Sequence, residues 1–323
     1  MSENISLDGS EENEIRTEDD FNVQYGSVPS LDKSSKRSIL DSIISTKFED
    51  LIPWEECRLP SNGLYYGWED GIVKVRAMGQ TAEKILATQR LAQSGQSIEY
   101  LFRECCQFPE GFEPIDLLIG DRIFLLYFLR GITYGNLYEF AVPCPNMDCN
   151  ILSTHTYDLN ELQRTIVFAR QDMGLEPFKV FLPYMSKVVD DDVYVGIRFL
   201  RAGDANQIIQ KKKNLKNNIA KPSKRNPFDR KLRQEQYDET VVENLEKVIV
   251  HVMDETDPVK IKAFIDRMHS QDTAVLREWI KDHTPGIDSG IEIHCPHCEQ
   301  QFSIELPITE TFFRPAKSAR ERT

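Results

Sequence analysis

Four cysteines lie in two short turns whose spacing is typical of metal-binding loops. The first turn reads C-P-x-x-x-C from Cys144 to Cys149, and the second reads C-P-x-C from Cys295 to Cys298. Structural Zn²⁺ takes four ligands in a tetrahedron, and thiolates are among its preferred ligands. Because each turn supplies only two thiols, the pattern predicts one zinc ion held jointly by Cys144, Cys149, Cys295 and Cys298.

A site of this kind would be structural, not catalytic. A catalytic zinc keeps one position open for water, and four thiolates leave none. The side chains of His294 and His297 flank the second turn and could replace a thiolate, but because four cysteines already complete the site we expect them in the layer outside the ligands or in solvent. The alternative is that the four cysteines are reduced and bind no metal, so that each turn is only the loop of a β-hairpin.

Short β-strands are expected on both sides of each turn, because apolar and polar residues alternate there. We therefore predict a zinc-ribbon-like element in which residues 140–160 come together with residues 290–308. The two halves are far apart in the sequence, but closing a long loop costs only slightly more than closing one of half its length. The metal would tie the C-terminal region to the middle of the chain.

No other combination of residues predicts catalysis. The chain lacks the glycine-rich phosphate-binding motifs, the H-E-x-x-H zinc motif and the G-x-S-x-G nucleophile motif. We interpret Asp190–Asp192 as a solvated turn, and Asp116 and Asp121 as helix-surface or N-cap residues. Three further cysteines are interpreted as unreactive core residues: Cys57, Cys105 and Cys106. We therefore predict that the protein is not an enzyme.

The composition is that of a globular protein with acidic character. The 323 residues carry a formal net charge of −13, which argues against a general nucleic-acid coat. The odd number of cysteines and the missing signal-peptide pattern point to a reducing compartment, where paired cysteines more often bind metal than form disulfides. The most apolar segment, residues 123–132, is much shorter than the ~20 residues of a transmembrane helix, so we expect no membrane association.

Three segments are predicted from changes in composition. Residues 1–45 are polar and strongly acidic at their start, so we expect a mobile arm with one short amphipathic helix near residues 37–45 that docks on a partner. Residues 46–316 are predicted to form a single fold, and residues 317–323 a tail. Within the fold, residues 211–233 hold ten lysines and arginines against one aspartate, which predicts a mobile basic loop.

The periodicity of the remaining chain predicts an α+β protein with a mainly helical body. Helices are expected near residues 82–92, 97–106, 114–129, 239–254, 258–265 and 273–281. Strands are expected after the Ser61-Asn62-Gly63 turn and near residues 71–78, 134–143, 177–183 and 192–200. The aromatic residues at the two ends of this region suit either core packing or contacts with a partner: Tyr65, Tyr66, Trp68, Phe312 and Phe313.

Three motifs resemble the baseplate hub subunit and hub assembly proteins of T-even-type contractile-tailed bacteriophages. They are L-P-S-N-G from Leu59 to Gly63, D-R-x-x-L-L-x-x-L-R-x-x-T-Y-G from Asp121 to Gly135, and L-P-I-T-E-T-F-F-R-P from Leu306 to Pro315. The resemblance covers about residues 55–315 and does not extend to the acidic arm or the basic loop.

This resemblance implies a non-enzymatic virion or assembly protein that acts through contacts with other tail proteins. Its expected place is the tail baseplate, or the host cytoplasm during assembly. Within the family, the alternative is an assembly chaperone that holds the hub or the tape-measure protein and then leaves. The alternative from another class is a zinc-ribbon nucleic-acid-binding or transcription accessory protein whose basic loop contacts phosphates, although a single aromatic residue in that loop, Phe228, is too little for base stacking.

Overall fold

The computed structural model describes residues 33–46, 51–89, 91, 96–220, 240–308 and 312–313. These residues fall into two units, with the division between Leu51 and Ile52. The first unit contributes the helix α1 (Lys33–Ser45), which includes the helix expected near residues 37–45. Most of the predicted acidic arm and the predicted tail lie outside the described residues, so the proposed segment boundaries remain predictions.

The second unit contains helices and strands in mixed order. Its α-helices are α3 (Gln80–Ala87), α5 (Ser97–Cys105), α6 (Ile119–Tyr134), α7 (Pro183–Val189), α8 (Ala202–Ala220), α10 (Thr240–Val248), α11 (Pro258–Ile265) and α12 (Ser270–His283). Short 3₁₀ helices lie at Leu64–Tyr66, Pro114–Asp116, Leu159–Thr165 and Gln171–Met173. Among the described helices, none is long and apolar enough to cross a membrane.

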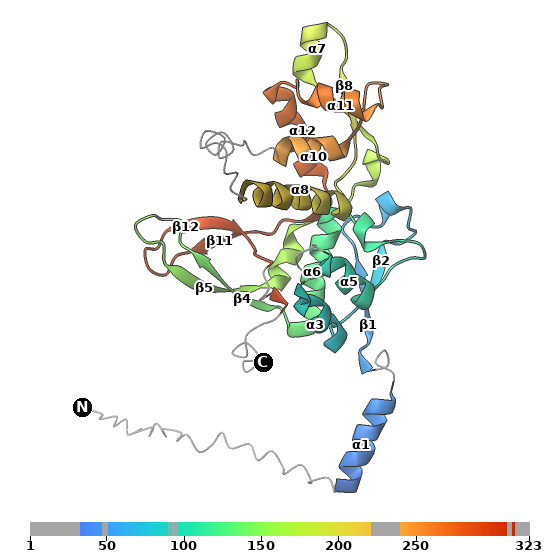
Figure 1. Cartoon of the computed structure of the whole chain (residues 1–323), viewed down its shortest axis with the longest axis vertical. Helices are drawn as coiled ribbons and strands as arrows, with labels where there is room; N and C mark the ends of the chain where they lie inside the picture. Colours follow the sequence, from blue (N-terminus) through green and yellow to red (C-terminus); the bar gives the residue numbers. More distant parts are fainter. Residues whose placement is uncertain are drawn as a thin grey trace, which may run out of the picture. The chain divides into compact units, whose positions relative to one another are not determined.

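The strands form small antiparallel sheets. β1 (Trp54–Arg58), β2 (Ile72–Arg76) and β3 (Cys106–Gln107) make one three-stranded sheet, and β7 (Phe178–Phe181), β8 (Tyr194–Ile197) and β9 (Ile249–Val252) make another. Three pairs complete the set: β4 (Leu137–Pro143) with β5 (Leu152–Asp158), β11 (Gly290–His294) with β12 (Gln301–Glu305), and β6 (Ile166–Val167) with β10 (Gly286–Ile287). The predicted α+β class is confirmed, with a helical body and separate β-hairpins (Figure 1).

The apolar residues gather in two core clusters. The first cluster surrounds α6 and includes β1, β2, α5 and the hairpins β4–β5 and β11–β12. The second cluster lies between the sheet β7–β8–β9 and the helices α10, α11 and α12. Five aromatic residues suited either core packing or partner contacts on sequence alone. All of them belong to these clusters or pack against them: Tyr65, Tyr66, Trp68, Phe312 and Phe313.

Helix α6 is buried and carries polar groups that bond to distant segments. The carboxylate of Asp121, which is fully buried, accepts hydrogen bonds from the Ser61 N–H and the Tyr66 hydroxyl at 2.9 and 2.7 Å. The hydroxyl of Tyr127 donates to the Leu306 carbonyl at 2.9 Å. The interpretation of Asp121 as a surface or N-cap residue is therefore wrong, because the residue supplies the acceptor that a buried turn needs.

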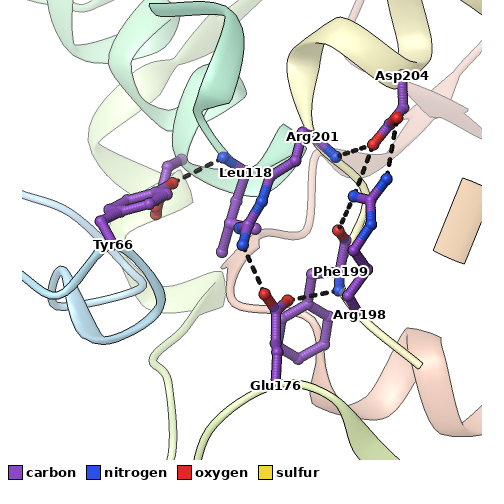
Figure 2. Close-up of polar contacts among 8 residues, drawn as sticks. Tyr66, Leu118, Glu176, Arg198, Phe199, Arg201 and Asp204 are labelled. Carbon is purple, nitrogen blue, oxygen red and sulfur yellow. Dashed lines mark hydrogen bonds and ion pairs between the residues drawn. The ribbon is translucent and has the colours of Figure 1, made fainter. Parts of the chain in front are cut away.

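A polar network joins the two clusters at the start of α6 and α8. The Tyr66 hydroxyl also accepts the Leu118 N–H at 2.7 Å, and the Arg201 guanidinium lies over the Tyr66 ring. Figure 2 shows how Arg201 then reaches Glu176, which accepts the Phe199 N–H, while Asp204 is paired with Arg198 and accepts the Arg201 N–H. The half-buried ion pairs tie β7, β8 and α8 to the first cluster.

Three predicted elements differ in type from the structure. The helix expected over residues 239–254 ends at Val248, and Ile249–Val252 form β9 because β8 offers these β-branched residues a strand partner. The basic loop expected over residues 211–233 is helical up to Ala220, since lysine is a good helix former; the rest of that segment lies outside the described residues. The strand expected after the Ser-Asn-Gly turn is a 3₁₀ helix, Leu64–Tyr66.

The substitution Tyr66→Phe should lower the free energy of unfolding by about 1–3 kcal/mol. It removes one hydroxyl and thereby leaves both the Leu118 N–H and an Asp121 oxygen without that partner in a buried place. Urea unfolding measures the change, and Tyr100→Phe, at an exposed position, is the matched control. Equal stability of the two variants would contradict the role assigned to the hydroxyl.

Candidate metal centre

Two hairpins position the four cysteines. Leu137–Pro143 pair with Leu152–Asp158 and close with the pair Pro143–Leu152, and Gly290–His294 pair with Gln301–Glu305 and close with His294–Gln301. The next residue in each hairpin is the first cysteine of the turn. The two hairpins come from distant parts of the sequence and lie side by side in Figure 1.

Each turn closes with a backbone hydrogen bond to its first cysteine. The Cys144 N–H donates to the Ile151 carbonyl at 3.0 Å, and the Cys295 N–H donates to the Gln300 carbonyl at 2.9 Å. Both of these cysteines are buried, whereas Cys149 and Cys298 are half-buried. The strands thus fix the backbone on both sides of the thiols.

The four thiols form one cluster with the dimensions of a tetrahedral site. All four Sγ atoms lie within 4.8 Å of one another. The Sγ atoms of Cys144 and Cys298 are 3.6 Å apart, and those of Cys149 and Cys295 are 3.8 Å apart. A tetrahedron with metal–sulfur bonds of ~2.3 Å has edges of about 3.8 Å, whereas a disulfide needs about 2.05 Å. The donor set and its spacing fit a single metal ion.

The electrostatics of the cluster favour a bound cation. Backbone N–H groups of His297 and Cys298 lower the pKa of the Cys295 thiol to about 6. Burial, in contrast, raises the pKa of Cys144 to about 12, because a buried thiolate loses its hydration. Four neighbouring thiolates repel one another unless a cation lies among them, and a metal ion deprotonates a coordinating thiol.

The residue that follows the second cysteine of each turn has a left-handed backbone. Asn150 has φ of 41° and Glu299 has φ of 57°. This conformation redirects the chain from the turn into the returning strand. Asparagine tolerates it well, whereas a glutamate pays a steric cost that glycine would not.

Asn146 supports the site from outside the sulfur cluster, and sequence reasoning missed it. Its side-chain nitrogen lies 4.0 Å from the Cys298 Sγ, which belongs to the other turn. Its side-chain oxygen accepts the Asp148 N–H, and its carbonyl accepts the Cys149 N–H, both at 3.0 Å. An asparagine two residues after the first cysteine could have indicated the local turn, but not the contact with the other turn.

The other residues considered in the sequence lie outside the cluster. His294 and His297 are exposed, and the four-residue cluster does not include them. Asp190–Asp192 are exposed at the end of α7, as expected for a solvated turn. The remaining cysteines are buried in the first core cluster, where burial raises the pKa of their thiols: Cys57, Cys105 and Cys106.

Hydrogen bonds hold the open ends of both hairpins, opposite their turns, to α6 or to one another. The Arg130 guanidinium, which is buried, donates to the carbonyls of Gly135 and Leu137 at 2.7 and 3.2 Å, where β4 begins. At the other hairpin, the segment after β12 is held by Tyr127 of α6 and by Tyr138 of β4, whose hydroxyl donates to the Pro307 carbonyl at 2.8 Å. These contacts bring the two turns together from the helical body.

Substitutions of Glu299 test the left-handed backbone of the turn without changing any of the four cysteines. We expect Glu299→Gly to keep the stability of the protein or to raise it by up to about 1 kcal/mol, because it relieves the left-handed strain. Glu299→Val should lower stability by more than about 1 kcal/mol, since a β-branched residue is an outlier at this φ. Chemical unfolding of both variants decides the matter, and a glycine variant less stable than the valine variant would contradict the assignment.

Comparison with known proteins supplies the family. Residues 52–314, most of the chain, match the family described as T4 bacteriophage base plate protein. No curated protein and no solved structure was found to match the chain. The matched range contains both cysteine turns, the whole of α6 and the polar network at its start. The chain therefore belongs to the T4-type bacteriophage baseplate protein family.

Proposed function

We propose that this protein is a non-enzymatic component of the phage tail baseplate hub and that its four clustered cysteines hold one structural Zn²⁺. The family match over residues 52–314 supports a structural baseplate protein. The hub position rests on the resemblance of the three sequence motifs to hub proteins. Its partners on this proposal are other tail proteins, among them the tape-measure protein, and its place is the virion tail or, during assembly, the host cytoplasm.

The ligands of the proposed ion are Cys144, Cys149, Cys295 and Cys298. The observation that supports the ion is the tetrahedral spacing of the four Sγ atoms. Bound zinc would offset two of the four negative charges of the thiolates and make two bonds to each turn, without a vacant position for water. The chain's own part is to hold both turns by their strands and by Asn146, so that the ion links hairpins that adjoin the same helix.

The proposed zinc link between the two hairpins, here called the clamp, suits a structural protein of a large assembly. A structural zinc stabilises the folded state directly, since the unfolded chain rarely offers a formed site. Here it would lock the C-terminal hairpin to the middle of the chain, so that a surface spanning both could resist forces in an assembly. An enzymatic role has no support from the cluster, because all four ligands are protein thiols.

Purified protein should contain about one zinc ion per chain by elemental analysis. The double variant Cys144→Ser, Cys298→Ser should lose the ion and unfold at a clearly lower temperature, because two of four ligands are removed. The variant Cys106→Ala is the matched control, since that cysteine is buried in the core away from the cluster. It should be somewhat destabilised yet keep its zinc.

Two results would count against the proposed ion. One is a protein prepared without chelator that holds no metal. The other is a double variant that retains the metal content of the wild-type protein. Iron in place of zinc would keep the four-thiolate site and correct only the identity of the ion.

An affinity-tagged protein should co-purify with baseplate or tape-measure proteins from infected cells, as identified by mass spectrometry. Detection of the same protein in purified virions would establish a permanent component, and its restriction to assembly intermediates would establish an assembly factor. A nucleic-acid-binding protein would behave differently, with retention on DNA or RNA that weakens steeply as salt rises. Such retention without any tail protein would overturn the baseplate proposal.

A further inference from the structure

A surface groove in the second unit is lined mainly by apolar side chains. It lies along α6 and the 3₁₀ helix at Leu159–Thr165 and has a volume of about 590 Å³. Its apolar lining includes Phe124, Phe128, Leu162 and Phe168, and Phe168 is 49% exposed. A groove whose lining is mainly apolar is a typical receptor for one face of an amphipathic helix.

Helix α1 has the complementary surface. Its aliphatic residues lie at helical spacing and are exposed, with fractions from 47% to 71%: Ile39, Leu40, Ile43 and Ile44. A helix of 13 residues is marginal in water by itself, because most helical stability in proteins comes from packing of an apolar face. A partner surface is therefore required for this helix to be well populated.

The sequence of α1 and the lining of the groove carry opposite net charges. The sequence of α1 holds three basic residues, Lys33, Lys36 and Arg37, against one acidic residue, Asp41. Glu55 is the single charged residue among the residues that line the groove. A basic helix with an aliphatic face is therefore better suited to this groove than an acidic one would be.

We propose that the groove binds helix α1 of a second copy of the chain. Each copy carries both surfaces, so two copies can exchange their helices reciprocally and form a closed two-fold dimer with two identical contacts. The reciprocal arrangement buries both apolar surfaces at once. The proposal is independent of the zinc ion and of the hub position.

The test is the oligomeric state of the full-length protein. Light scattering after size-exclusion chromatography should find a dimer that dissociates on dilution. Ile43→Asp in α1 and Phe168→Asp in the groove should each weaken dimerisation at least about tenfold, because each places a charge in an apolar contact. Ser38→Asp on the opposite side of α1 and Val167→Asp beside the groove add the same charge at exposed positions outside the proposed contact, and dimerisation should be unchanged.

A mixing experiment separates this contact from any other dimer interface. The Ile43→Asp chain keeps an intact groove, and the Phe168→Asp chain keeps an intact α1. Mixed together, they should form a heterodimer through one remaining contact, whereas a chain with both substitutions should not pair with itself. A monomeric wild-type protein, or a dimer that both single variants leave unchanged, would overturn the proposal. Circular dichroism of each variant confirms that a lost dimer is not a lost fold.

Discussion

The polar side chains of the buried helix α6 need hydrogen-bond partners, and the segments that supply these partners are thereby held in place in the larger unit. An unpaired buried donor or acceptor costs about 1–3 kcal/mol, so α6 is stable in the core only if its polar side chains meet partners. Asp121 accepts a hydrogen bond from the Ser61 N–H, the Tyr127 hydroxyl donates one to the Leu306 carbonyl, and Arg130 donates to the carbonyls at the start of β4. The helix thereby fixes three segments that are distant in the sequence.

The cluster of four cysteines depends on this arrangement. One cysteine hairpin leaves the C-terminal end of α6, and the other returns to the Tyr127 and Tyr138 hydroxyls after its second strand. With both open ends fixed, the strand pairing carries the turns to the same place, and four Sγ atoms meet within 4.8 Å. The proposed ion would add four metal–sulfur bonds to this geometry and so stiffen the connection between helix and hairpins.

The motifs that carry the phage resemblance are the residues that make these contacts. L-P-S-N-G supplies the buried Ser61 N–H, and the helix motif supplies Asp121 and Arg130. The C-terminal motif supplies the Leu306 carbonyl and Phe312, which packs edge-on against Tyr127 and Tyr138. The residues that carry the resemblance are thus among those that join the core of this family member.

The sequence by itself determined the local features of this protein and the number of metal ligands that each turn can supply. The alternation around Cys144 and Cys295 indicated hairpins, and the number of thiols per turn indicated that two turns must meet, because zinc chemistry requires four ligands. Only the tertiary structure decided that Asp121 is buried and that Asn146 reaches the opposite turn. The same holds for Ile249–Val252, which form a strand because β8 is beside them. These outcomes depend on neighbours from distant segments, and no pattern within one segment contains them.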